Sequence, residues 1–325
     1  MGKLIKTFEE MTKADFQEAG GKAANLGELS QGGFNVPPGC CVTSEALFHH
    51  IEENGLQDKI DQIAASFDYE EYSDLDKKCK EIRDFIYSVD IPNDLLAEIR
   101  IGYRSISDAS NSFVAVRSSV AVKDSSVSSF PGMMDTYHYL KEEEEVIDHV
   151  KKCWASLWTT RAVMARHNKN IDHNLGLIAA IIQKMVHSEK AGVMFTANPI
   201  TSERGEIVIE ANWGLGESVV SGKSMNDFYV LGKSPLELKQ KQISKKTLTI
   251  DFDEEKGYGR QEMAVESDRM DAPTLSEEEA LELGREGIKI EGLFGVPQDI
   301  EWAYEKGELF ILQSRDIRTL KDQAA

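Results

Sequence analysis

The spacing of apolar residues divides the chain into a first half that is mainly helical and a second half that is rich in strands. In the first half, apolar residues recur at helical spacing, and Ser44 is a predicted helix N-cap. The helices predicted there span about 22–29, 44–55, 74–88, 93–106 and 142–167. The last of these is expected to be one long amphipathic helix, and a strand is expected at 113–117.

In the second half, short apolar or alternating runs predict strands. They lie at 177–185, 192–196, 206–211, 228–231, 299–304 and 309–314. One helix is expected over about 276–293, whereas residues 233–270 are charged and irregular, which indicates a surface excursion. The predicted class is α+β, with a helical N-terminal lobe at residues 1–186 and a sheet-rich C-terminal lobe at residues 187–325.

Composition and charge exclude several classes of protein. With 41% hydrophobic and 29% charged residues, the chain of 325 residues is in the globular range. Its longest apolar run is about six residues, against the ~20 that a membrane span needs. The N-terminus lacks the apolar stretch of a secretory signal, so a cytoplasmic location is expected. The net charge of −19 disfavours nucleic acid and anionic membranes as partners, although a local basic pocket can still bind phosphate.

Four familiar catalytic or nucleotide-binding motifs are absent from the sequence. Gly20-Gly21-Lys22 is followed by Ala23 rather than Ser or Thr, so this segment is not a P-loop. Gly214-Leu215-Gly216 lacks the third glycine of the dinucleotide-binding fingerprint, and neither HExxH nor GxSxG occurs. The enzyme classes that depend on these motifs therefore lose their support.

Two basic residues are candidates for binding an anion. Lys22 follows two glycines at the start of a predicted helix, where backbone N–H groups and an ammonium can meet one anion. An ordinary surface helix start fits this residue equally well. Arg117 ends an apolar strand and precedes Ser118 and Ser119, and a structural salt bridge is the alternative role there.

Two further segments are candidates for enclosing a ligand. The loop at residues 128–134, SSFPGMM, is flexible enough to close over a ligand and is flanked by small hydrogen-bond donors. Gln183 and Met185 stand at the end of a buried strand, where an amide and backbone groups can read the edge of an adenine ring. A simple edge-strand ending remains the alternative for this second segment.

A C-terminal hairpin carries the more specific signal. Glu301 and Gln313 lie on two predicted neighbouring strands. If the loop around Gly307 has an odd number of residues, the period of two places both side chains on one face. Two oxygen donors on one face suit Mg²⁺, which fills the rest of its shell with water and phosphate. Arg315 on the same face can neutralise a phosphate in transfer. The polar outer face of an ordinary hairpin is the alternative.

Taken together and in this order, these segments resemble the ATP-binding domain of the phosphoenolpyruvate synthase and pyruvate phosphate dikinase family. The same domain occurs in rifamycin phosphotransferases and in the ATP subunit of phenylphosphate synthase. The resemblance extends from about Lys22 to Arg315. The matching segments are GGKAANLGEL, VPPGCCVTSEA, FVAVRSSV, SSFPGMMDTYH, CWASLWTTRAV, IIQKMVHSEKAGVMFTANP, IVIEANWGLGESVVSG, FGVPQDIEWAY and LFILQSR.

The resemblance implies a fold, a reaction and a set of partners. The fold is ATP-grasp, with the nucleotide between the two lobes. The reaction is that of an ATP- and Mg²⁺-dependent, dikinase-type phosphotransferase similar to pyruvate, water dikinase, which phosphorylates a carrier histidine on a separate swivelling domain. The acceptor is pyruvate in phosphoenolpyruvate synthase, and phenol or rifamycin in the other relatives. A non-catalytic module that senses ATP is the alternative from a different class.

The resemblance also assigns roles to individual residues. Those assigned to ATP are Lys22, Arg117, Gly132, Thr136, Gln183, Met185, Glu217 and Arg315. Within this set the catalytic candidates are Lys22, Arg117 and Arg315, which would hold or stabilise the phosphates. Gln183 and Met185 would border the adenine, and Glu217 would approach the ribose or the phosphates. Glu301 and Gln313 would ligate Mg²⁺.

The sequence departs from the family pattern at several positions. Ala23 replaces a usual Gly, Lys123 occupies a usually acidic position, and Asp316 replaces a usual Pro. The family's carrier histidine follows a Thr-Gly-Gly stretch, and these 325 residues contain no such stretch. The expected partners are therefore a phosphohistidine domain and an acceptor-binding domain or subunit, both in trans.

Overall fold

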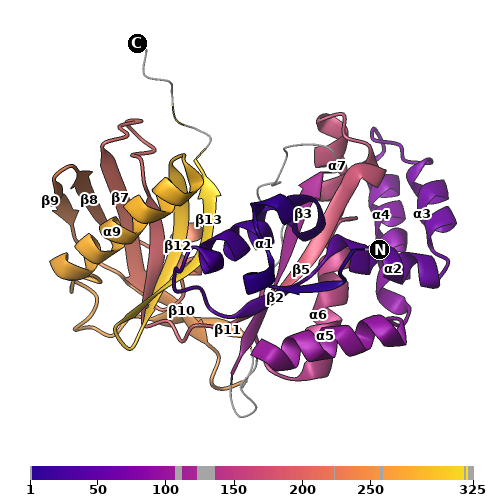
Figure 1. The fold of residues 1–325 in the computed structure, drawn as a ribbon, viewed down its shortest axis with the longest axis horizontal. Coiled ribbons are helices and arrows are strands. Elements are labelled where there is room, and N and C mark those ends of the chain that lie inside the picture. The colour runs from indigo at the N-terminus through magenta and orange to yellow at the C-terminus, as the bar shows by residue number, and fades with distance from the viewer. Residues whose placement is uncertain are drawn as a thin grey trace. The chain divides into compact units, whose positions relative to one another are not determined.

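The chain folds into two compact units, each with its own sheet and helices (Figure 1). The structure is a computed structural model that describes residues 2–106, 112–122, 136–222, 224–256, 259–317 and 320. The first unit comprises Met1–Gln31 and Pro38–Met185, and the second comprises Gly32–Pro37 and Val186–Ala325. The mixture of helices and strands confirms the predicted α+β class. The sequence analysis did not anticipate that residues 32–37 belong with the second unit.

Among the described residues, five strands form the sheet of the first unit. Their order is β1–β2–β5–β3–β4, and every neighbouring pair is antiparallel. The strands are β1 (Ile5–Thr7), β2 (Gly39–Val42), β3 (Val114–Val122), β4 (Thr136–Leu140) and β5 (Gly176–Lys184). The expectation of a helical lobe was incomplete, because it missed β1, β2 and β4. Strands of three to five residues have too few positions to show an alternating pattern.

Helices cover one face of this first sheet. The apolar side chains of that face, among them Val114, Val116 and Ile182, belong to one large buried cluster with residues of the helices. The helices on this face are α2 (Ser44–Glu53), α3 (Gln57–Ala64), α4 (Tyr72–Ser88), α5 (Asn93–Ile106), α6 (Glu143–Ser156) and α7 (Thr160–Asn168). Helix α1 (Phe16–Gln31) lies on the other face, and short 3-10 turns occur at Phe8–Glu10, Lys13–Asp15 and His173–Leu175.

The long helix predicted over 142–167 is in fact two helices, α6 and α7. Thr159 has an extended backbone, and its hydroxyl accepts a hydrogen bond from the Ala162 N–H at 3.3 Å. This side-chain cap starts a new helix where apolar spacing alone suggested a continuous one. Thr43, rather than the predicted Ser44, occupies the N-cap position of α2.

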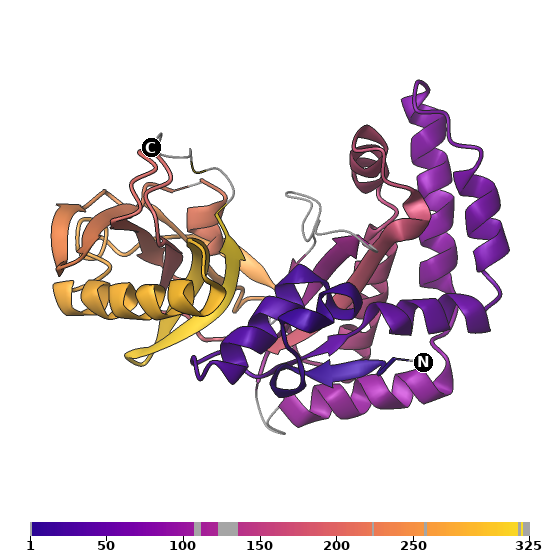
Figure 2. The ribbon, with the colours of Figure 1, turned by 45° about the horizontal axis from the view of Figure 1, so that its top comes forward.

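In the second unit, six of the described strands form one antiparallel sheet in the order β13–β12–β6–β7–β8–β9. They are β6 (Lys190–Phe195), β7 (Glu206–Trp213), β8 (Asp227–Lys233), β9 (Leu236–Gln242), β12 (Gln298–Glu305) and β13 (Glu308–Asp316). Helix α9 (Glu277–Phe294) runs across the strands, and a turned view shows it along one side of the sheet (Figures 1 and 2). Ser276 caps its start, and Gly295 ends it in the left-handed conformation.

The expectation that residues 233–270 are irregular was wrong, because this part of the chain contains regular strands. It holds β9 and a two-stranded hairpin of β10 (Leu248–Phe252) and β11 (Arg260–Ala264). Strands β9 and β11 are mostly exposed on both faces, whereas β10 is half-buried. Since neither face needs to be apolar, the alternation that identifies a half-buried strand is missing from the sequence.

A buried ion pair ties the segment just before the β10–β11 hairpin to the main sheet. Lys246 Nζ lies 2.7 Å from Asp227 Oδ1, and both side chains are fully buried. The second oxygen of Asp227 accepts a hydrogen bond from the Thr274 N–H at 2.7 Å. Removing one partner of such a pair typically costs ~3–5 kcal/mol. Asp227 of β8 thus anchors the chain before and after the β10–β11 hairpin.

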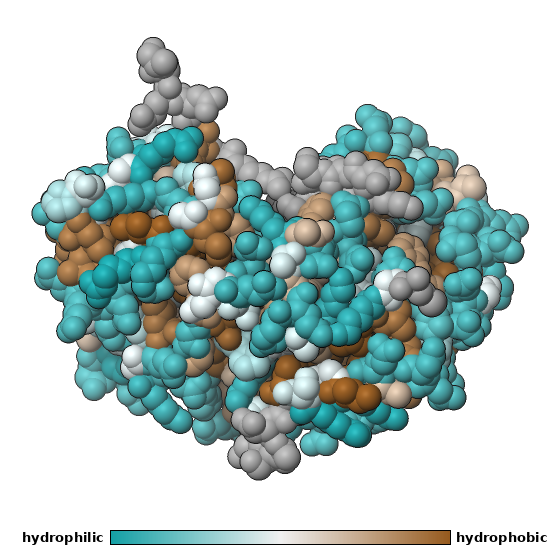
Figure 3. Space-filling view, viewed as in Figure 1, coloured by the Kyte–Doolittle hydropathy of each residue, from teal (hydrophilic) through white to brown (hydrophobic). Residues whose placement is uncertain are grey.

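The polarity of the surface is consistent with the high content of charged residues. Hydrophilic residues predominate on the face drawn in Figure 3. Among the described residues, none of the helices combines the length and the apolar character needed to cross a bilayer.

Candidate functional site

In the first unit, three of the predicted site residues share the face of the sheet opposite the large helical cluster. Arg117 on β3 stands directly opposite Thr136 on β4. The Nη1 group of Arg117 donates a hydrogen bond to Oε1 of Gln183 on β5, at 3.3 Å. Residues directly opposite each other on antiparallel strands share a face, so the strand register itself brings these side chains together.

Helix α1 covers part of the same face and carries Lys22. The helix is interrupted at Gly20, whose backbone is non-helical with φ of 74°. A Cβ at Gly20 would lie 2.4 Å from the Ser119 hydroxyl oxygen, so only glycine fits there. The Ser119 hydroxyl accepts a hydrogen bond from the Ala23 N–H at 3.2 Å. Lys22 therefore lies in the first turn after the interruption, between Gly20 and Ala23, which both meet Ser119 of β3.

The other predicted nucleotide contacts of the first unit stand at the end of β5. Gln183 is 4% exposed, and Met185 is partly exposed, with its N–H donating to the Phe113 carbonyl at 2.9 Å. The loop at 128–134, including Gly132, and the altered position Lys123 lie outside the described residues.

In the second unit, the strand register pairs the two residues predicted to bind metal. Glu301 on β12 stands directly opposite Gln313 on β13. Their side chains lie on one face of the sheet, as expected, but the condition of an odd loop is not met, because the turn between the strands holds only Lys306 and Gly307. A one-residue shift in register places Gln313, rather than Leu312, opposite Glu301. A β-bulge follows this pair between Glu301 and Trp302 and shifts the register of the remaining hairpin.

Arg315 lies on the same face and has an acidic partner that the sequence analysis missed. Arg315 stands opposite Asp299, and its Nε donates to Asp299 Oδ2 at 2.7 Å. Burial raises the pKa of the Asp299 carboxyl, although the Arg315 guanidinium opposes this rise. Asp299 comes two positions before Glu301 on an alternating strand, and this spacing was the available signal.

This face of the second sheet, which we call the open face, is the face opposite helix α9. The alternate residues of β12 point toward the helix, because the Tyr304 hydroxyl donates to Glu282 of α9 at 2.7 Å. On the open face, a small apolar cluster adjoins the polar residues. It consists of Val186, Ala191, Ala303, Phe310 and Leu312. The open face thus places an apolar surface next to the carboxylate of Glu301, the amide of Gln313 and the guanidinium of Arg315.

The predicted Glu217 also belongs to the open face. The residue before it, Gly216, lies over β6, where a Cβ would be 3.6 Å from the Ala191 Cβ. Glu217 begins the short helix α8 (Glu217–Val220) and forms an ion pair with Arg260 of β11. No local pattern pointed to Arg260, since its partner lies 43 residues away.

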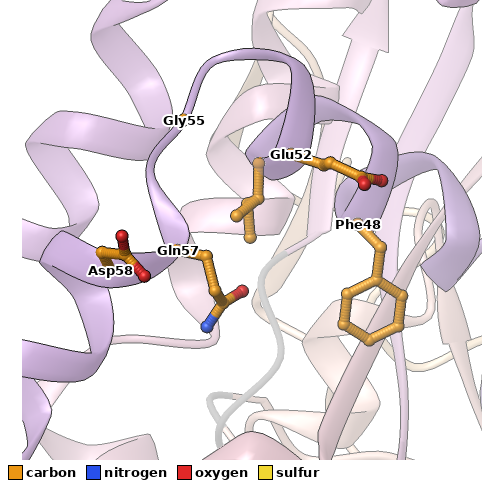
Figure 4. Close-up of a pocket in the computed structure, with 6 residues that line it drawn as sticks. Phe48, Glu52, Gly55, Gln57 and Asp58 are labelled. Atoms are coloured by element: carbon orange, nitrogen blue, oxygen red, sulfur yellow. The ribbon is translucent and has the colours of Figure 1, made fainter.

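Two surface pockets lie apart from these faces. In the first unit, a pocket of about 400 Å³ is lined by Phe48, Ile51, Glu52, Gly55, Gln57 and Asp58 of α2 and α3 and the turn between them (Figure 4). In the second unit, a pocket of about 500 Å³ borders α9, the β12–β13 turn and residues 33–35. Neither is lined by a predicted site residue. In the part of the chain that the structure describes, no group of three or more His, Cys, Asp or Glu is arranged to hold a metal ion.

Comparison with known protein families decides among the classes that this geometry allows. Residues 16–325 match the family described as pyruvate phosphate dikinase, AMP/ATP-binding domain. The chain belongs to this family. The resemblance found in the sequence is thereby confirmed, and it covers the units that carry both groups of predicted site residues.

Curated relatives share 37–42% identity with the chain. It is 39% identical to the phosphoenolpyruvate synthase of Pyrococcus furiosus, over 99% of this chain and 44% of the relative. It is 42% identical to a probable phosphoenolpyruvate synthase of Methanocaldococcus jannaschii, over 98% of this chain and 27% of the relative. It is 39% identical to a rifampicin phosphotransferase of Bacillus cereus, over 98% of this chain and 36% of the relative. The chain therefore spans less than half the length of these relatives.

Among solved structures, a D-alanine–D-alanine ligase of Bacillus anthracis aligns with 76% of this chain and 57% of its own. The TM-score is 0.29 and the identity is 8%, a likeness too weak to assign a fold.

Proposed function

We propose that this chain is the ATP-binding component of a dikinase-type phosphotransferase, which uses ATP and Mg²⁺ to phosphorylate a carrier histidine on a separate domain or subunit. The observation that carries the proposal is the direct pairing of Glu301 with Gln313 on the open face, in a chain of an AMP/ATP-binding family. The ATP-grasp fold and the cytoplasmic location expected from the sequence remain part of this proposal.

The residues of the open face have the chemistry that Mg²⁺ requires. Glu301 offers carboxylate oxygens, and Gln313 offers an amide oxygen directly opposite on the same face. Mg²⁺ prefers oxygen ligands and usually keeps water and substrate phosphates in its shell, so one or two protein ligands suffice. When bound there, the metal would neutralise charge on the phosphates. Glu301 and Gln313 would hold it, and the adjacent Arg315 would stabilise the phosphoryl group in transfer.

The first unit would supply the remaining contacts with ATP. Lys22 and Arg117 would bind the phosphates, with Thr136 beside Arg117 and Gly132 in the covering loop. Gln183 accepts a hydrogen bond from Arg117, which supports a common role for both residues. At the end of β5, Gln183 and Met185 would border the adenine.

The chemical step needs a nucleophile from outside the residues assigned here. A nitrogen of the carrier histidine attacks a phosphorus atom of the polyphosphate, an N–P bond forms, and the P–O bond to the departing phosphate or nucleotide breaks. The leaving oxygen retains the electron pair. The chain's own residues would orient the phosphates and stabilise the negative charge that develops on them.

The proposal predicts how the chain behaves without partners. We expect these 325 residues to bind ATP in the presence of Mg²⁺ but to show no sustained turnover with pyruvate, phenol or rifamycin, because they contain no Thr-Gly-Gly stretch followed by a carrier histidine. Titration calorimetry measures binding, and a coupled assay for nucleotide products measures turnover. Robust product formation by the chain alone would show that no partner is needed.

The identity of the final phosphate acceptor is the most specific part of the proposal. Phosphoenolpyruvate synthases dominate the relatives described above, and this favours pyruvate over rifamycin or phenol. A non-catalytic module that senses ATP would need the adenine contacts but would have no use for the Glu301–Gln313 pair. That alternative is therefore less favoured than the enzyme.

A further inference from the structure

The carboxylate of Glu217 is held in a fixed orientation by one arginine. Arg260 Nη2 donates to Glu217 Oε1 at 2.7 Å, and Arg260 Nε pairs with Glu217 Oε2. Two parallel contacts between a guanidinium and a carboxylate fix the geometry of both groups. The side chains are 38% and 30% exposed, respectively. Because exposed ion pairs contribute little to stability, this pair is not needed to hold the fold together.

The hairpin that carries Arg260 also fixes the backbone on which Glu217 stands. The Leu215 N–H donates to the Ile250 carbonyl of β10 at 2.8 Å. The Thr249 hydroxyl donates to the Trp213 carbonyl at 2.7 Å. Gly214 has φ of 70°, and a Cβ there would lie 2.3 Å from the Thr249 hydroxyl oxygen. Strand β10 therefore holds the loop at 213–216, while β11 holds the side chain that follows it.

The hairpin in turn is anchored on the main sheet at both of its ends. Asp227 of β8 binds Lys246 and the Ser244 N–H before the hairpin, at 2.7 and 2.9 Å. It binds Thr274 after the hairpin. All of these contacts are buried. The hairpin is thus a rigid support for Glu217 rather than a loose surface excursion.

We propose that Arg260 is a positioning residue that orients Glu217 so that its Oε1 accepts a hydrogen bond from the 2′-hydroxyl of the ATP ribose. This inference rests on the proposed function. Arg260 binds both oxygens of Glu217, and Oε2 is buried beside its guanidinium. A carboxylate oxygen can accept more than one hydrogen bond, so Oε1 keeps a lone pair for a hydroxyl donor. Arg260 also neutralises a charge that would otherwise repel the polyphosphate.

Comparing ATP with 2′-deoxy-ATP tests this proposal. We expect the wild-type chain to bind ATP about tenfold more tightly in titration calorimetry with Mg²⁺, because deoxy-ATP lacks one hydrogen bond to a charged acceptor. Arg260→Ala should reduce this preference to about threefold or less. Arg260→Lys keeps the positive charge but loses the planar guanidinium with its two parallel donors, so it should also reduce the preference to about threefold or less. Glu217→Ala should abolish the preference, whereas Lys245→Ala, an exposed charge before β10, should leave it unchanged.

The outcomes separate this inference from the proposed function. If the wild-type chain does not bind ATP, the proposed function itself fails. If it binds ATP but shows no preference over deoxy-ATP, or if both Arg260 variants keep the preference, the positioning role is wrong. Equal loss of affinity for both nucleotides in the Arg260 variants would reveal a purely structural role and would also overturn the proposal. Thermal melting of each variant verifies that it is folded.

Discussion

Replacing Glu301 with Gln should reduce phosphotransfer to a carrier histidine by about 10²–10³-fold, while ATP binding without metal changes less than about threefold. The substitution keeps the shape of the side chain and removes its charge. Glu301 is the one anionic ligand assigned to Mg²⁺ beside Gln313, so the loss falls on the metal-dependent step. Adenine binding, which depends on other residues, should remain.

A matched variant controls for the loss of one acidic charge. Glu237→Gln makes the same change at an exposed position on β9 of the same sheet, and it should transfer phosphate at the wild-type rate. Transfer rates come from rapid-quench measurements with a competent carrier domain, at several Mg²⁺ concentrations. If Glu301→Gln transfers phosphate at the wild-type rate at all of them, Glu301 is not a metal ligand.

Replacing Arg117 should weaken the binding of ATP·Mg²⁺, by about tenfold for Arg117→Lys and about 100-fold for Arg117→Ala. The planar guanidinium can contact two phosphate oxygens and at the same time donate to Gln183, whereas an ammonium cannot reproduce this geometry. A net charge of −19 repels ATP at long range, so binding depends on cations concentrated at the site. Lys22→Ala should weaken the binding of ATP·Mg²⁺ about tenfold, because it also removes a cation from the site.

Calorimetric titration measures these affinities, and thermal melting verifies that each variant is folded. Arg161→Lys, an exposed position on α7, is the matched control and should bind ATP as the wild type does. Unchanged affinity and unchanged transfer in both the Arg117 and the Lys22 variants would place the nucleotide elsewhere on the chain.

Local patterns in the sequence predicted those features of the fold that depend on neighbouring residues. The alternating pattern near the C-terminus predicted the two strands of the hairpin that carry Glu301 and Gln313, whereas the β-bulge that pairs these two residues was not predicted. The boundaries of α5 match the predicted 93–106. Where the chain has a strong periodic pattern and a short connection, local geometry determines the structure.

Features that depend on a distant partner or on a side-chain cap were not predictable in this way. The break between α6 and α7 depends on the hydroxyl of Thr159, which caps α7, and the spacing of apolar residues carries no information about such a cap. The partnership of Glu217 with Arg260 joins residues 43 positions apart, across a hairpin that the sequence did not reveal. The site residues therefore keep their predicted roles as proposals, while the structure adds Asp299 and Arg260 as their neighbours.

The most direct test of the account is transfer of labelled phosphate from ATP to a carrier histidine. The chain is incubated with Mg²⁺, ATP labelled in both its β- and γ-phosphates, and the phosphohistidine domain of a phosphoenolpyruvate synthase relative. The account predicts label on the carrier that is lost in acid and stable in base, that depends on Mg²⁺, and that disappears with Glu301→Gln but not with Glu237→Gln. A carrier that stays unlabelled, although the chain binds ATP and the carrier accepts phosphate from its own synthase, would contradict the account.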